Sequence, residues 1–280
     1  MADLYFFYLC PLHCGTTITA QYIAASVDGY LSPYGNYEGL NEPSVAQFVP
    51  KRSYRKQVPF NWPAIKDAWD TVLAESGKTI FVEASPQNIM HLDEMLPVFE
   101  PGYRAVLGIS HPLRMIGSLV KLNTGDKRRT ISLSKDLGRR LSFSIKKTLK
   151  YMQQQAENRQ RYAFPVVTYE GFCANPKVVA EAFGVEGADP TIKLPGKRRS
   201  EERQIRDLSG RDTAYLKEDE ITAVLEAFQP HEDLLASFGY TLPENVDAVK
   251  ARYDPAEWQI GVERRQQFDR DQAAHLSLEA

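Results

Sequence analysis

The feature that most constrains the fold is a strand, a turn and a helix start near the beginning of the chain. Residues 4–10 form a continuous aromatic and apolar run. Such a run is typical of a strand that is buried on both faces of a parallel sheet. Ile18, Tyr22 and Ile23 have helical spacing among good helix formers. Pro11–Thr17 therefore connects a buried strand to a helix.

This connecting turn contains one glycine and two hydroxyl residues, Gly15, Thr16 and Thr17. A strand, a glycine-containing turn and a helix start bring free backbone N–H groups and the helix dipole to one spot, which predicts a phosphate-binding turn that resembles a P-loop. The alternative is an ordinary turn in which glycine only provides backbone freedom. A true Walker A loop is excluded because no lysine precedes Thr16 and the earlier glycine is absent.

Composition indicates an ordinary globular protein and excludes several classes. The 280 residues suffice for one large domain, or for one domain with an extension. A net charge of −2 gives no case for a nucleic-acid or membrane partner. The three cysteines lack paired metal-type spacing, so neither a disulfide framework nor a metal site is expected. The oligomeric state leaves no signal in the sequence.

The sequence also bears on membrane insertion and targeting. No apolar run approaches the roughly 18 residues that a membrane span requires, and the N-terminus leads directly into the first strand. We therefore expect no membrane span and a cytoplasmic location.

Strands alternate with helices along the first part of the chain. Three further buried strands are predicted at residues 78–83, 104–109 and 164–169. Helical patterns separate them, so the expected fold is a three-layer α/β/α domain around a central parallel sheet. Ligands of such sheets bind at the carboxyl ends of the strands. That rule puts four side chains on one rim: His13, Glu83, Ser110 and Glu170.

Residues 27–64 are rich in turn formers and aromatic residues. Long ordered excursions of this kind are often lids or binding loops, so this segment is predicted to be a lid or an acceptor-binding excursion. Alternatively, its aromatic residues only fix the loop to the domain. The basic cluster Lys51–Lys56 within it either meets an anionic ligand or forms a solvated face.

Residues 124–161 form a basic segment in the middle of the chain. Residues 124–161 are helix-prone, with Ile145, Leu149 and Met152 as the expected inner stripe. The predicted α/β domain covers residues 1–245, and residues 246–280 are expected to be a charged C-terminal helix or a tail.

With these elements placed, the chain resembles the sulfotransferases that use 3′-phosphoadenosine 5′-phosphosulfate (PAPS). Pro11–Thr17 is similar to the family's 5′-phosphosulfate loop, with His13 and Cys14 in place of a basic residue and a serine. Val82–Pro86 resembles the Glu-Lys-Ser-Pro element of several carbohydrate sulfotransferases, with Ala84 in place of the lysine.

Three more segments follow in family order. Ser110–Ser118 resembles the 3′-phosphate element, with Ser110 where the family has arginine and with Pro112 and Ser118 at the family spacing. Val167–Phe172 resembles the strand end Tyr-Glu-Asp-Leu, and residues 228–240 resemble the final helix. The resemblance extends over residues 3–242 as a scatter of motifs.

The resemblance implies transfer of a sulfuryl group from PAPS to a hydroxyl of a carbohydrate or small-molecule acceptor, without a metal. Because two family cations are replaced, Arg114 and the later basic segment are candidates to supply charge. The implied cofactor-binding residues are Cys14, Gly15, Thr16, Thr17, Ser110, Arg114, Ser118, Lys197, Arg198 and Arg199.

Two catalytic roles follow from the same resemblance. Glu83 is the candidate base for the acceptor hydroxyl. His13 would stabilise the bridging oxygen of the leaving nucleotide, with a charge that depends on pH near about 6.5. The alternatives are that Glu83 is a helix cap or surface carboxylate, and that His13 is a capping or packing histidine.

Two other functions are compatible with the sequence. A nucleotide-dependent phosphotransferase, such as a kinase, would use the same turn, although the Walker lysine is missing. A non-catalytic relative that keeps the fold for nucleotide binding is suggested by His13, Ala84 and Ser110, where the family has other residues.

Overall fold

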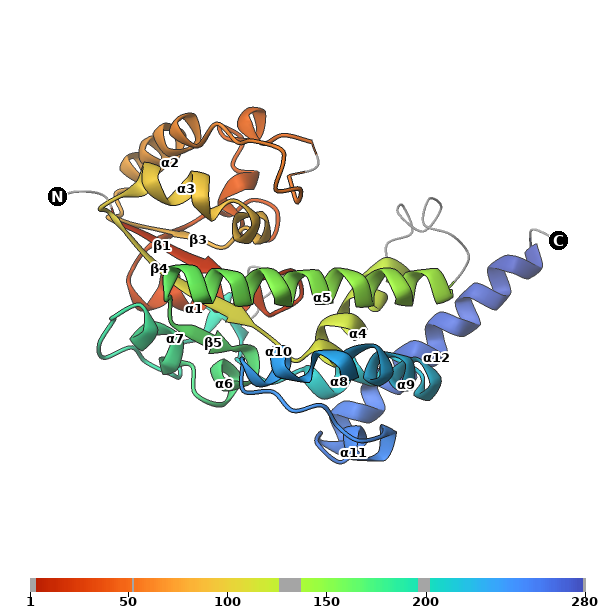
Figure 1. The fold of residues 1–280 in the computed structure, drawn as a ribbon. Helices are drawn as coiled ribbons and strands as arrows, with labels where there is room; N and C mark the ends of the chain where they lie inside the picture. The colour runs from red at the N-terminus through yellow and green to blue at the C-terminus, as the bar shows by residue number, and fades with distance from the viewer. Residues whose placement is uncertain (1–3, 52, 126–136, 196–201, 279–280) are drawn as a thin grey trace. The chain divides into compact units, whose positions relative to one another are not determined.

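The computed structural model of the chain describes residues 4–51, 53–125, 137–195 and 202–278 (Figure 1). The chain forms two compact units that alternate along the sequence. The first contains Met1–Ile109 and Gln154–Arg206, and the second contains Ser110–Gln153 and Asp207–Ala280. The domain boundary expected at residue 245 stays a prediction.

The first unit is built on a five-stranded sheet in which every neighbouring pair is parallel. The strands are β1 (Leu4–Leu9), β2 (Tyr30–Leu31), β3 (Ile80–Glu83), β4 (Tyr103–Ile109) and β5 (Val166–Thr168). Their order is β2-β3-β1-β4-β5, so the strand order reverses direction between β1 and β4. The predicted α/β fold with a central parallel sheet is confirmed, and β2 is an additional short strand.

The aromatic run of β1 packs on both faces of this sheet. Tyr5 and Phe7 point to one face, where their ring centroids lie 4.7 and 5.0 Å from that of Phe99. Phe6 points to the other face and stacks on Phe183 at 4.8 Å. Tyr5, Phe6 and Phe7 are each at most 1% exposed, because successive side chains of a strand alternate between two covered faces.

Helices cover both faces of the sheet in the first unit (Figure 1). One layer consists of α2 (Trp62–Ser76) and α3 (Leu92–Phe99), and the other consists of α1 (Thr16–Ser26), α6 (Tyr169–Ala174) and α7 (Lys177–Ala182). Ile65, Trp69 and Leu73 of α2 have helical spacing and form its buried side.

The excursion at residues 27–64 is largely irregular, as predicted. It contains β2, the short 3₁₀ helices η1 (Gly39–Asn41) and η2 (Ala46–Phe48), and the start of α2. A further 3₁₀ helix, η3 (Pro86–Met90), follows β3. A small hairpin of β6 (Leu194–Pro195) and β7 (Glu202–Arg203) is antiparallel.

The described part of the second unit is helical. It contains α4 (Pro112–Gly125), most of α5 (Leu137–Tyr162), α8 (Ser209–Thr213), α9 (Glu218–Phe228), η4 (Gln229–His231), α10 (Glu232–Ala236), α11 (Val246–Lys250) and α12 (Pro255–Leu278). A Cβ on Gly117 of α4 would lie 2.0 Å from the carbonyl oxygen of Asp212 in α8. This close approach explains why a glycine is required at residue 117.

The inner stripe of α5 differs from the sequence prediction. Met152 is buried, but Ile145 and Leu149 are only half-buried. The fully buried positions are instead mostly polar: Arg140, Ser144, Thr148, Gln155 and Asn158. The pattern of apolar residues was therefore a poor guide to the buried side of this helix.

No helix among the described residues combines the length and apolar character that crossing a bilayer requires.

A buried ion pair joins α9 and α12 in the second unit. Nη1 and Nη2 of Arg265 donate to the two oxygens of the Glu220 carboxylate, at 2.8 and 3.0 Å. The side chains are 4% and 11% exposed. A bidentate pair with this burial stabilises the fold only while both partners are present.

We predict that Arg265→Met lowers the free energy of unfolding by about 3–5 kcal/mol, because it leaves the Glu220 carboxylate buried without its cation. Urea denaturation measures the change. The control is Glu218→Ala, which removes the carboxylate that pairs with Lys250. Because the Glu218 side chain is 72% exposed, this substitution should leave the denaturation midpoint close to that of the wild type. Equal effects of the two substitutions would contradict the prediction.

Candidate functional site

The carboxyl edge of the sheet gathers the predicted side chains of the first unit. Because β1, β3 and β5 are parallel, their carboxyl ends lie on the same edge. Residues 11–17 follow β1, Glu83 is the last residue of β3, and Glu170 comes shortly after β5. Ser110 directly follows Ile109, the last residue of β4, and belongs to the second unit. Ligands of parallel sheets bind at this edge, next to the position where the strand order reverses.

The turn after β1 has the backbone geometry of an anion cradle. Gly15 is the N-cap of α1 and has φ +77°, and His13 has φ +68°. The backbone N–H groups of Gly15, Thr16 and Thr17 donate to no acceptor among the described residues. Open amides at a helix N-terminus attract anions because they combine hydrogen-bond donors with the positive end of the helix dipole. We call Gly15–Thr17 the cradle.

The threonine hydroxyls of the cradle are already used inside the protein. Thr16 Oγ1 donates to the carbonyl of Pro11 and Thr17 Oγ1 donates to the carbonyl of Asn36, each at 3.3 Å. An anion at the cradle would therefore meet the backbone amides first, and it would bind a hydroxyl only after that hydroxyl had released its carbonyl.

Tyr169 packs directly on the cradle, a contact that the sequence analysis missed. A Cβ on Gly15 would lie 2.3 Å from Cδ2 of the Tyr169 ring. Tyr169 is 2% exposed and its hydroxyl donates to the carbonyl of Arg206 at 3.2 Å. Glycine is thus needed at residue 15 for its positive φ and for the space that the ring occupies. The available signal was an aromatic residue directly after a buried strand.

His13 and Cys14 precede the cradle and differ in exposure. His13 is half-buried, and its positive φ is uncommon for a residue other than glycine, as at many functional sites. The Cys14 thiol is fully buried and donates to the carbonyl of Leu12 at 3.9 Å, and Cys10 Sγ donates to the Cys14 carbonyl at 3.7 Å. The predicted contribution of Cys14 is therefore limited to its backbone.

The Glu83 carboxylate is fully buried at the end of β3. Oε2 accepts a hydrogen bond from the Gly39 N–H at 2.6 Å, and Oε1 accepts from the Ser85 N–H at 2.7 Å and from Asn88 Nδ2 at 2.8 Å. Burial raises the pKa of Glu83 from 4.5 to about 7, although these hydrogen bonds lower it. The group is thus not a surface carboxylate, and through Gly39 it accepts the first N–H of η1.

Glu83 and Ser85 hold the excursion at one point. Leu40 N–H donates to Ser85 Oγ at 3.1 Å, and Trp69 Nε1 donates to the Gly39 carbonyl at 3.0 Å. A Cβ on Gly39 would lie 2.2 Å from Glu83 Oε2. The segment at Gly39–Leu40 therefore covers the carboxylate, and only a residue without a side chain allows this contact.

A buried amide joins the two strands at the point where the order reverses. Gln155 Nε2 donates to the carbonyls of Leu9 and Gly108, at 2.7 and 2.8 Å, near the ends of β1 and β4. Asn158 Nδ2 donates to Gln155 Oε1 at 3.2 Å and to the Ile89 carbonyl at 3.0 Å. This network ties α5 to the carboxyl edge and to η3, and no sequence motif indicated it.

In the second unit, two of the predicted 3′-phosphate residues lie together. Arg114 Nη1 donates to Ser110 Oγ at 3.4 Å, and Ser118 is half-buried one turn further along α4. Arg114 is 5% exposed and Nη2 lies 3.8 Å from Asp212 Oδ2. Asp212 also pairs with Lys121, so part of the charge expected of Arg114 is balanced inside the unit.

The remaining predicted ligands, Lys197, Arg198 and Arg199, lie outside the described residues. Strand β6 is next to α1, where Gln21 Nε2 donates to the Pro195 carbonyl at 3.4 Å. Within the described part of the chain, no group of three or more His, Cys, Asp or Glu side chains is arranged to hold a metal ion.

Comparison with known proteins gives a likeness in structure alone. No family model and no curated protein sequence matches the chain. Among solved structures, a sulfotransferase from Alicyclobacillus acidocaldarius is 15% identical, with a TM-score of 0.52 over 92% of this chain and all of that chain. The sulfotransferase domain from the curacin biosynthetic pathway is 14% identical, with a TM-score of 0.45 over 74% of this chain and 84% of that one. The first of these likenesses shows that the chain has a sulfotransferase fold.

We predict that inorganic pyrophosphate stabilises the wild type by binding the cradle amides. Gly15→Ala should destabilise the protein and abolish this effect, because the new Cβ must displace the Tyr169 ring. The control is Gly77→Ala, at φ +69° with no atom within 4 Å of the new Cβ. The control should cost only the backbone strain, about 1–2 kcal/mol. Thermal denaturation with and without pyrophosphate measures both effects, and matching behaviour of the two variants would contradict the cradle assignment.

We predict that the stability contributed by Glu83 falls as pH rises. Because the folded pKa is about 7 and the ordinary value is 4.5, the contribution is fully present below about pH 4.5 and is lost as pH rises through about 7. The loss is about 3 kcal/mol at about 1.4 kcal/mol per pH unit. Urea denaturation of wild type and Glu83→Gln across this range isolates the effect, and parallel pH profiles would contradict it.

Proposed function

We propose that the protein is a sulfotransferase that transfers the sulfuryl group of PAPS to a hydroxyl of a carbohydrate or small-molecule acceptor. The observation that carries the proposal is the set of open amides at Gly15–Thr17 on the same sheet edge as Glu83. The likeness of the fold to a solved sulfotransferase supports it.

The cradle fits the phosphosulfate end of PAPS. Three adjacent N–H groups that have no acceptor among the described residues lie at the N-terminus of α1, whose first turn contains no acidic residue. They provide donors and a positive potential for an anion. When bound, PAPS supplies the sulfuryl group that the acceptor hydroxyl receives. Gly15, Thr16 and Thr17 would hold its 5′-phosphate, and their fixed donors would neutralise charge there at no cost in reorganisation.

Sulfuryl transfer resembles phosphoryl transfer, in which the protein mainly positions groups and balances charge. His13 is the proposed proton donor or cation for the bridging oxygen of the leaving nucleotide, since it lies in the turn two residues before Gly15. Its imidazole would do this only when protonated. Ser110, Ser118 and Arg114 are proposed to bind the 3′-phosphate, with Lys197–Arg199 as additional cations.

Glu83 is the proposed general base. With a pKa of about 7 it is a stronger base than an exposed carboxylate, and it is still ionised in an appreciable fraction at neutral pH. In the described arrangement its oxygens are occupied by Gly39, Ser85 and Asn88. Accepting a proton from an acceptor hydroxyl therefore requires the Gly39 segment to move away from Oε2.

The burial of Glu83 also favours a second candidate function. If the carboxylate only fastens the excursion, the protein is a non-catalytic nucleotide-binding relative of the sulfotransferases. The two functions share the cradle and differ in whether Glu83 meets an acceptor.

We predict that 3′-phosphoadenosine 5′-phosphate raises the melting temperature, because a ligand that binds only the folded state stabilises it by about 2.7 kcal/mol at a hundred times its Kd. Glu83→Gln should keep this shift and lose at least about a hundredfold in sulfate transfer from PAPS. Transfer by the wild type should show a bell-shaped pH profile, because Glu83 must be ionised and His13 must be protonated.

Glu38→Gln is the matched control. Like Glu83, Glu38 is a buried glutamate (8% exposed), but it lies in the excursion and is given no catalytic role. It should retain both the shift and the transfer. Absence of a shift in the wild type at saturating nucleotide would reject PAPS as donor, whereas a shift without transfer to any acceptor would favour the non-catalytic relative.

A further inference from the structure

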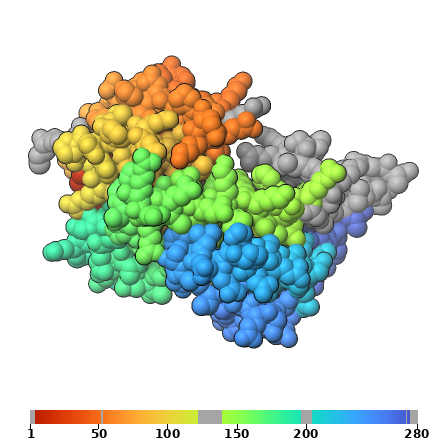
Figure 2. Space-filling model, in the orientation of Figure 1, coloured from red at the N-terminus to blue at the C-terminus, as the bar shows by residue number. Residues whose placement is uncertain are grey.

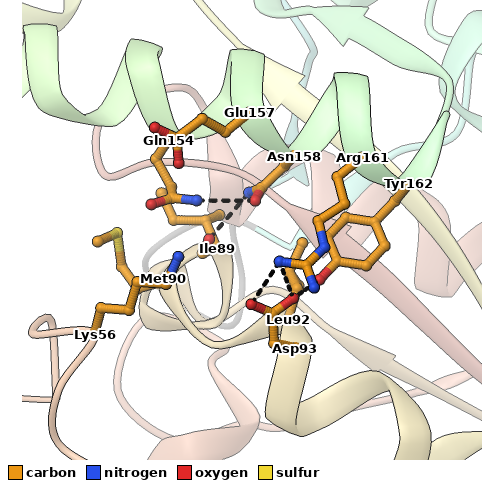
Figure 3. A pocket seen from close by; sticks show the side chains of 10 residues that line it. All are labelled: Lys56, Ile89, Met90, Leu92, Asp93, Gln154, Glu157, Asn158, Arg161 and Tyr162. Carbon is orange, nitrogen blue, oxygen red and sulfur yellow. Dashed lines mark hydrogen bonds and ion pairs between the residues drawn. The ribbon is translucent and has the colours of Figure 1, made fainter.

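A cavity of about 240 Å³ opens beside η3 in the first unit (Figure 3). Ile89, Met90 and Leu92 provide aliphatic surface, and Gln154 and Asn158 of α5 form an opposite wall. In the space-filling view, the green C-terminal half of α5 borders the yellow segment of α3 at the surface (Figure 2). The cavity is large enough for about one ring-sized group and is smaller than most drug-sized ligand sites.

The cavity adjoins the segments that surround the proposed base. Ile89 directly follows Asn88, which donates to Glu83, and the Ile89 carbonyl accepts from Asn158 at 3.0 Å. Asn158 also contacts Gln155, which caps β1 and β4 at the carboxyl edge. The cavity therefore runs along η3 and the end of α5. Its Gln154 end is next to the carboxyl edge of the sheet, and its Tyr162 end extends toward the start of β5.

Part of the polar lining is already paired. Arg161 Nη1 binds the Asp93 carboxylate at 2.7 and 2.8 Å, and the Tyr162 hydroxyl donates to the same carboxylate. Gln154 Nε2 donates to Asn158 Oδ1 at 3.0 Å. These contacts fix the wall before any ligand binds, as expected of a preformed site.

Two charged groups remain available at the mouth. Lys56, from the excursion, and Glu157, from α5, are exposed and form no hydrogen bond or ion pair with any described residue. Figure 3 shows them on opposite sides of the cavity. Among the lining residues Lys56 and Arg161 are cationic and Asp93 and Glu157 are anionic, so the lining has no net formal charge. It offers donors on one side and acceptors on the other.

We infer that this cavity is the acceptor subsite and that it takes one uncharged, polyhydroxylated ring, such as a sugar or a cyclitol. The inference rests on the proposed function for the role as acceptor. Hydroxyls around such a ring can accept a hydrogen bond from the Lys56 ammonium on one side. On the other side they can donate to the side-chain oxygens of Gln154 and Glu157. Its C–H face matches the aliphatic surface of η3.

Other classes of acceptor fit the lining less well. A flat phenolic ring gains most from an open aromatic face or a wide apolar cleft, and the Tyr162 ring is stacked on Phe164 at 5.4 Å. An anionic acceptor would meet the carboxylates of Asp93 and Glu157, and a strongly cationic one would meet Lys56 and Arg161.

The test is saturation-transfer NMR on the full-length protein with methyl β-glucopyranoside and myo-inositol as probes and tyramine as the phenolic comparison. Gln154→Trp fills the cavity, and Gln160→Trp places the same residue at an exposed position of α5 outside the lining. We expect a signal from at least one polyol in the wild type, at least a tenfold smaller signal in Gln154→Trp, and an unchanged signal in Gln160→Trp. If Gln154→Trp fails to fold, Glu157→Gln and Lys56→Gln should each weaken polyol binding severalfold.

No polyol signal in the wild type, an undiminished signal in the cavity variants, or a cavity-dependent signal from tyramine alone would overturn the inference. The nucleotide-induced melting shift, measured on the same samples, separates this failure from that of the proposed function. A shift without polyol binding rejects only the subsite. Polyol binding without a shift rejects the sulfotransferase, and with it the role of the cavity as an acceptor subsite.

Discussion

The contact on which the candidate site depends is that between Gly15 and the Tyr169 ring. Gly15, with its positive φ, ends the turn after β1 and is the N-cap of α1, whose first amides have no acceptor among the described residues. The ring fills the space beside the glycine, so the turn is held from the side rather than by hydrogen bonds to its amides. The amides are therefore available to bind an anion. Tyr169, which follows β5 and donates to the Arg206 carbonyl, supports the turn.

The architecture was predictable because it depends on strong local patterns. The aromatic run at residues 4–10 became β1, and helical spacing at Ile18, Tyr22 and Ile23 became the buried side of α1. The glycine turn between them was recognisable from composition alone. Such features depend on residues close in sequence, and hydrophobic periodicity reports them directly.

Contacts between distant residues were not predictable in this way. Gln155 is buried because it satisfies carbonyls at Leu9 and Gly108, and nothing near Gln155 in the sequence indicates those partners. The same holds for Asp212 beside Arg114 and for Gly39 over Glu83. In each case a buried polar group has its partner in a remote segment, which an apolar pattern cannot reveal.

The central claim is that the amides of the cradle bind the 5′-phosphate of the nucleotide. The most direct test is the change in amide chemical shifts of ¹⁵N-labelled protein on addition of 3′-phosphoadenosine 5′-phosphate. The account predicts that the Gly15, Thr16 and Thr17 amides shift strongly and saturate together with the melting-temperature change. Unchanged shifts at these three residues while the nucleotide binds elsewhere would contradict it.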